Sequence, residues 1–181
     1  MLNPGKIVIV VIVAVAIAAA GFSTWYHYQH AHRSQDFWGV DTAVLIAQAP
    51  GVEVLQLAVP GTVEPTSSES DVAPLRSQIA VGAKRYDVMA SREAAKARGM
   101  SNVRRALVID TTFDWESPAP AGQPRWQYAI DFREGSRGAM VLFDFDSHQV
   151  ASALGQPTTL LDPAANADMR QFFAEQFDAK K

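Results

Sequence analysis

The chain contains no cysteine, and this absence removes several classes of chemistry at once. Disulfide bonds, thiolate zinc sites, cysteine nucleophiles and lipid attachment to a cysteine are all excluded. An excess of positive charge is also missing, because 16 Lys plus Arg face 19 Asp plus Glu and the net charge is -3. Such a chain has no basic field that would release counterions from a phosphate backbone, so we expect no nucleic-acid partner.

The short motifs of common enzymes and cofactor sites are missing as well. We find no glycine-rich phosphate loop, nucleophile elbow, paired zinc motif or dinucleotide-binding fingerprint. We therefore expect no cofactor, and we favour a protein that is not an enzyme. The length of 181 residues suffices for one ordinary domain in addition to a membrane segment.

The most distinctive feature that is present lies near the N-terminus. Residues 7–22 carry no charge and are mostly Val, Ile and Ala, and Trp25, Tyr26 and Tyr28 follow them. A helix over 6–28 is long enough to cross a hydrocarbon core of about 30 Å, and the aromatic rings suit the headgroup layer. The alternative is a signal peptide cleaved near Ala20, since small residues follow the apolar run.

We predict a retained signal anchor in a bacterial inner (plasma) membrane, with the lipid bilayer as one partner. The chain then divides into a short cytoplasmic N-terminus at 1–5, a transmembrane helix at 6–28, a juxtamembrane segment at 29–35 and an extracytoplasmic domain at 36–178. The orientation depends mainly on Lys6. Cleavage near Ala20 would instead give a secreted or periplasmic protein.

Apolar spacing in the remaining sequence predicts one α+β domain with the order α-β-β-α-β-β-α. Helices are expected at 36–49, 92–109 and 162–177, and strands at 52–59, 79–89, 125–133 and 138–146. The stretch at 92–109 forms one or two helical segments divided near Gly99, with Ser101 or Asn102 as the cap of the second. The last helix begins with Asp162 as its cap and Pro163 in its first turn, and its apolar stripe consists of Met169, Phe172, Phe173 and Phe177. Residues 60–74, rich in Pro and Ser, are predicted to form a mobile loop. The fold class is therefore an antiparallel sheet covered by helices, including a hairpin at about 125–146.

The hairpin carries the sharpest local signal, because a tight turn centred on Gly135-Ser136 gives a register that aligns two apolar faces. Registers shifted by two residues would align the same faces. The register with this turn pairs residues of matching character and places Glu134 opposite Arg137. The predicted apolar pairs are Phe132 with Ala139, Ile130 with Val141, Tyr128 with Phe143 and Trp126 with Phe145.

Several short segments carry a resemblance to known sequences. They are Gly99-Met-Ser-Asn-Val-Arg-Arg-Ala-Leu, Phe113-Asp-Trp, Trp126-Gln-Tyr-Ala, Val141-Leu-Phe-Asp-Phe and Met169-Arg-Gln-Phe-Phe-Ala-Glu-Gln-Phe. Together they resemble an uncharacterised family of bacterial single-pass membrane-anchored α+β proteins with no assigned activity. The resemblance extends over most of residues 36–178 and implies the fold, but it implies no cofactor and no site residue.

Two groups of side chains are weak candidates for a metal site. His27 and His30 would share one face of a helix, and Asp144, Asp146 and His148 alternate along a predicted strand, where Asp131 could join them. The simpler interpretation is headgroup contact for the histidines and a solvated strand face for the carboxylates. Arg104 and Arg105 lie in a basic stretch that we interpret as a solvated helix face, with an acidic partner or anionic lipid as the alternative.

These patterns rank three kinds of function. The first is a membrane-tethered envelope protein whose domain binds another protein or assists a membrane complex. The second is an extracytoplasmic small-ligand-binding domain with an apolar pocket lined by Trp115, Trp126 and Phe143. The third is a hydrolase that uses the groups near Asp146 and His148.

Overall fold

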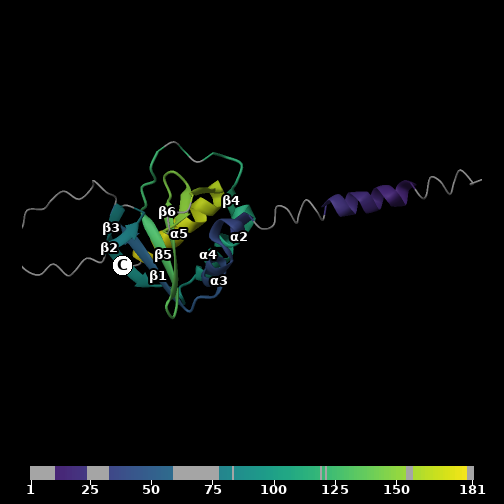
Figure 1. Cartoon of the computed structure of the whole chain (residues 1–181). Coiled ribbons are helices and arrows are strands. Elements are labelled where there is room, and N and C mark those ends of the chain that lie inside the picture. The colour runs from purple at the N-terminus through teal and green to yellow at the C-terminus, as the bar shows by residue number, and fades with distance from the viewer. Residues whose placement is uncertain are drawn as a thin grey trace, which may run out of the picture.

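The alternating apolar residues that follow Pro50 form one of the central strands of an antiparallel sheet (Figure 1). The computed structural model describes residues 11–23, 33–58, 78–82, 84–118, 120, 122–153 and 157–178. Within them the sheet has eight strands in the order β2-β3-β1-β5-β6-β7-β8-β4. Their bounds are β1 Gly51–Leu57, β2 Gln78–Val81, β3 Lys84–Glu93, β4 Phe113–Asp114, β5 Tyr128–Glu134, β6 Arg137–Asp144, β7 Gln149–Ser152 and β8 Thr159–Leu161.

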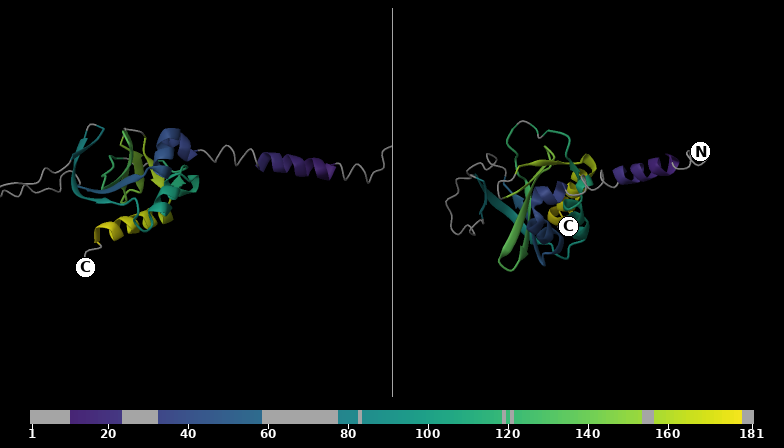
Figure 2. Two further views of the ribbon diagram at one scale, coloured as in Figure 1. Left: turned by 90° about the horizontal axis from the view of Figure 1, so that it is seen from below. Right: turned by 45° about the vertical axis from the view of Figure 1, so that its right-hand side comes forward.

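The helices pack on one face of this sheet (Figure 2). They are α2 Arg33–Trp38, α3 Val40–Gln48, α4 Met100–Leu107 and α5 Pro163–Asp178, with a short 3-10 turn at Asp110–Thr112. Their inward side chains meet the same-face residues of the central strands, such as Val54, Ile130 and Phe143. The opposite face has a smaller core around Leu55, Tyr86 and Leu142, to which Trp126 contributes. The predicted α+β architecture with helices on an antiparallel sheet is confirmed.

The hairpin of β5 and β6 has the predicted register from Tyr128 to Glu134. Ile130 lies opposite Val141, and Glu134 lies opposite Arg137, with which it forms an ion pair. The predicted pairing of Trp126 with Phe145 is wrong. The strand begins only at Tyr128, and the side chain of Gln127 accepts the N–H of Phe145 in place of a backbone carbonyl. The backbone leaves the ladder there, and Trp126 packs on the opposite face of the sheet from Phe145.

Two elements that were predicted as single are each divided in the structure, and some short strands were not predicted. The first predicted helix is two helices, because Gly39 adopts φ +78° between α2 and α3. The strand expected at 79–89 is a hairpin of β2 and β3 around Gly82, where φ is +56°. The stretch expected to be helical at 92–109 is an α-helix only at Met100–Leu107, because β3 continues to Glu93 and turns follow it. The strands β4, β7 and β8, which have only two to four residues each, were not predicted.

The N-terminal boundary of the domain also differs from the prediction. Arg33 and Ser34, which were assigned to the juxtamembrane segment, belong to α2, and Ser34 is buried. A helix covers 11–23, and all of its described residues are exposed. Across the described ranges, no helix combines the length and the apolar character needed to cross a membrane. The remaining parts of the expected span at 6–28, and the expected loop at 60–74, lie outside the described residues.

Candidate functional site

The candidate site begins with the way the chain enters α4. Gly99 has φ +89° and precedes the helix, which starts at Met100 and not at the Ser101 or Asn102 cap expected from the sequence. A side chain on Gly99 would crowd Phe172, since an added Cβ would lie 3.3 Å from its ring. Glycine therefore allows α4 and α5 to approach closely at this point. Val103 and Leu107 are buried, which leaves Asn102 on the outer side of the helix.

The second wall of the site is α5, whose start is defined by its sequence. Asp162 accepts the N–H of Ala164 at 2.9 Å, and Pro163 occupies the first helical position, as predicted. Met169, Phe172 and Phe173 are buried along its inner side. The ring of Phe173 lies within 4.8 to 5.4 Å of Tyr128, Phe143 and Phe145, so aromatic contacts attach the helix to the sheet.

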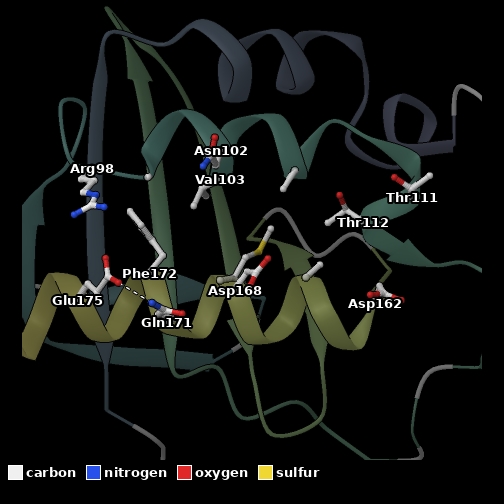
Figure 3. A pocket seen from close by; sticks show the side chains of 14 residues that line it. Arg98, Asn102, Val103, Thr111, Thr112, Asp162, Asp168, Gln171, Phe172 and Glu175 are labelled. Carbon is white, nitrogen blue, oxygen red and sulfur yellow. Dashed lines mark hydrogen bonds between the residues drawn. The ribbon is translucent and has the colours of Figure 1, made fainter.

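Between these helices lies a groove of about 490 Å³, which we call the α4–α5 groove (Figure 3). Its floor is apolar and comes from both helices, with Val103, Met169 and Phe172 at its base. Polar side chains form its rim. The rim residues are Arg98, Asn102, Thr111, Thr112, Asp162, Asp168, Gln171 and Glu175.

The charges on this rim are unequal. The rim carries three carboxylates and only one guanidinium. The carboxylates belong to Asp162, Asp168 and Glu175, and the guanidinium belongs to Arg98. Glu175 accepts a hydrogen bond of 2.9 Å from Gln171, whereas the carboxylate of Asp168 has no hydrogen bond or ion pair with any described residue. The groove thus combines an apolar base with a net negative rim, which suits a ligand that carries both an apolar and a cationic group.

The carboxylates singled out in the sequence have structural roles. Asp144 is buried and accepts backbone N–H groups from Arg125 at 2.8 Å, Asp146 at 3.2 Å and Ser147 at 3.3 Å. It therefore fixes the turn after β6. Asp146 is exposed and accepts hydrogen bonds from Gln127 and Arg170. His148 has φ +58° within the tight connection between β6 and β7.

The predicted metal ligands do not converge in the described part of the chain. Asp131 sits on β5 opposite Met140 and binds Arg133, so it does not join Asp144. No group of three or more His, Asp or Glu side chains among the described residues is placed to hold a metal ion. His27 and His30 lie outside the described residues.

The three aromatic side chains expected to line one apolar pocket are separated. Phe143 is fully buried beneath α5, whereas Trp126 belongs to the core on the other face of the sheet. Trp115 is half-buried and packs at the edge of the helix-side core beside Phe37, with ring centroids 6.0 Å apart. They do not form a shared cavity.

The α4–α5 groove was not predicted from the sequence. The apolar period of α5 indicated its inner stripe, but its outer side was expected to be an ordinary solvated surface. One signal was present, because Asp168 and Glu175 are seven residues apart and therefore lie on one helix face. Their position opposite α4 depends on tertiary packing, which the sequence pattern does not give.

No family model matches the chain, and comparisons with curated proteins and with solved structures gave no significant match.

Proposed function

We propose that this protein is tethered to a membrane by its N-terminal helix and binds a basic segment of a partner protein in the α4–α5 groove. The observation that carries the proposal is the groove's apolar base beneath a rim with three carboxylates and one guanidinium. A lysine or arginine of the partner would lie beside Asp168, which no described residue neutralises. An adjacent apolar side chain would then contact Met169 and Phe172.

The tether is supported by the uncharged run at 7–22 and by the surface of the helix at 11–23. That helix exposes Val11, Ile12, Val13, Val15, Ile17 and Phe22, with 51% to 68% of each side chain accessible. Burial of six large apolar side chains is worth roughly 9 to 18 kcal/mol, so this segment would be much more stable in lipid than in water. Retention in a bacterial inner membrane, with the domain outside the cytoplasm, is the arrangement we propose.

Site-specific photo-crosslinking in native membranes tests the groove. A photoreactive residue at Asn102 should trap a partner through a peptide rich in Lys or Arg. The same photoreactive residue placed at Ser136, an exposed position in the β5–β6 turn, should trap no partner. The crosslinked peptide is identified by mass spectrometry, and trapping through an acidic or uncharged segment would contradict the proposal.

A second test compares the same reversal of charge inside and outside the groove. Asp168→Lys replaces an attraction by a repulsion worth about 1 to 2 kcal/mol at an exposed rim, which is roughly a five- to thirtyfold loss of binding. Glu134→Lys makes the same change of charge at an exposed hairpin position outside the groove and should leave trapping unchanged. Equal effects of the two substitutions would show that the rim charge is not involved.

A further inference from the structure

The outer side of α3 carries an apolar stripe, which is unusual for the exposed face of a domain helix. Val40 and Val44 are 66% and 42% exposed, and they lie one turn apart on the same side. Ala47, exposed as well, continues this stripe. We call these three residues the α3 stripe. The helix buries Leu45 and Ile46 on its inner side, so the exposed valines are not required for packing within the domain.

The α3 stripe lies close to the point where the chain enters the domain from the N-terminal helix. Arg33 begins α2, which joins α3 directly (Figure 1). This entry is held firmly, because the carboxylate of Asp110 accepts the N–H groups of Arg33 at 3.3 Å and Ser34 at 2.7 Å. The hydroxyl of Ser34 also donates to the carbonyl of Val108 at 2.9 Å.

The length of the tether limits how far this entry point can lie from a bilayer. If Trp25 to Tyr28 lie in the headgroup layer, four residues separate them from Arg33. A fully extended chain covers at most about 3.6 Å per residue, so Arg33 stays within about 18 Å of that layer. The helices α2 and α3 are then the elements of the domain that a short tether brings to the membrane first.

We propose that the α3 stripe rests in the headgroup layer of the same bilayer that holds the N-terminal helix. This inference depends on the proposed membrane tether. The half-buried aromatic pair of Phe37 and Trp115 lies at the same entry, because the indole N–H of Trp115 donates to the carbonyl of Asp110 at 2.9 Å. The two rings add apolar surface beside the entry, while the indole N–H is satisfied within the domain. The domain is therefore held in one orientation and not merely attached.

Local charge specifies the kind of lipid surface. Asp36 and Asp41 are exposed on α2 and α3, and Arg33 is already paired with Glu116 at 2.8 Å. These acidic groups would be repelled by anionic headgroups. The contact should therefore form on zwitterionic phosphatidylcholine vesicles and should not strengthen when anionic lipid is added.

Spin labels can locate the α3 stripe in the full chain, since a protein without cysteine accepts single labels cleanly. Val40→Cys and Val44→Cys are compared with Ala174→Cys, an exposed helical position in α5. The C-terminal end of that helix lies away from α2 (Figure 1). Each labelled protein is reconstituted in phosphatidylcholine vesicles. The collision rates of the label with oxygen, which enters lipid, and with a water-soluble nickel chelate are then measured.

We expect the ratio of oxygen to nickel collisions at positions 40 and 44 to be roughly threefold or more above that at position 174. Interfacial helices lie about 5 to 10 Å into the boundary of headgroups and acyl chains, which gives this contrast. Equal ratios, in protein that floats with the vesicles, would overturn the inference and leave the tether intact. Exclusion of both reagents with dipolar broadening would show a second copy on the stripe and would also overturn it. Failure of the protein to float with the vesicles would refute the tether itself.

Discussion

Arg104 is a structural residue although it lies in a basic stretch that the sequence suggested was solvated. Its guanidinium donates to the carbonyl of Ile46 at 3.2 Å and to that of Ala49 at 2.5 Å, which satisfies the C-terminal end of α3. The same group lies 5.5 Å from the centroid of the Phe132 ring. Partial burial lowers the pKa of Arg104 below its usual value, although the side chain stays charged at any ordinary pH.

Replacing Arg104 by alanine should remove both hydrogen bonds and the ring contact. Charge-assisted hydrogen bonds contribute about 1.5 kcal/mol each at the low end, which suits a half-buried site, so the loss is about 3 kcal/mol. For a domain of roughly 146 residues the entropy of unfolding is about 0.3 kcal/mol per degree, which converts this loss to about 10 °C. Thermal unfolding of the full chain in detergent, followed by near-ultraviolet circular dichroism, measures the shift.

The neighbouring Arg105 provides the control, because it is exposed on the same helix and its side chain has no hydrogen bond or ion pair with any described residue. Arg105→Ala changes helix propensity and net charge by the same amount as Arg104→Ala, and it should lower the melting temperature by no more than about 2 °C. Arg104→Lys, which keeps the charge but loses the forked geometry, should fall between the two. Equal shifts for both alanine variants would refute the assigned role of Arg104.

Three further outcomes are expected. Gly99→Ala should destabilise the domain by more than Gly135→Ala. Both positions have positive φ, but only at position 99 would the added Cβ press against Phe172. Urea denaturation measures the difference in unfolding free energy, which we expect to be about 1 kcal/mol. Burial raises the pKa of Tyr86 above its usual value of about 10, so the folded state keeps a proton there that the unfolded chain loses. Stability should therefore fall above about pH 10, and Tyr86→Phe should reduce that fall in alkaline unfolding experiments. Finally, the intact mass of protein extracted from carbonate-washed membranes should include the whole N-terminal helix; a mass that begins after Ala20 would show cleavage instead.

Secondary-structure elements were predicted correctly where the apolar period and the local turn or cap residues indicated the same boundaries. The register from Phe132–Ala139 to Tyr128–Phe143 followed from alternation together with a tight turn at Gly135-Ser136. Alternation excludes a shift of one residue, and the position of the turn selects among shifts of two. The start of α5 followed from Asp162 and Pro163. The short strands β4, β7 and β8 gave no comparable signal, since two to four residues are too few to show a period.

The prediction failed mainly where a side chain took the place of a backbone group. Gln127 ends β5 by binding the N–H of Phe145, and Arg104 turns inward to cap α3. The sequence pattern made Asp144 a candidate metal ligand, but its carboxylate holds the turn after β6. Each role depends on a neighbour that is distant along the chain or on the detailed shape of a turn. The α4–α5 groove likewise required the packing of two helices about 60 residues apart.

The position of β1 in the sheet has a consequence for synthesis of the chain. β1 pairs with β3 on one side and with β5 on the other, so its second edge stays open until β5 has been synthesised and has reached the same compartment. About 70 residues separate the two strands, and at 5 to 20 residues per second the delay is roughly 4 to 14 s. During that interval a strand with Val52, Val54, Leu55 and Leu57 exposes apolar side chains and free backbone groups. A newly made chain would need a holding chaperone most in this interval, before β5 is available to complete the centre of the sheet.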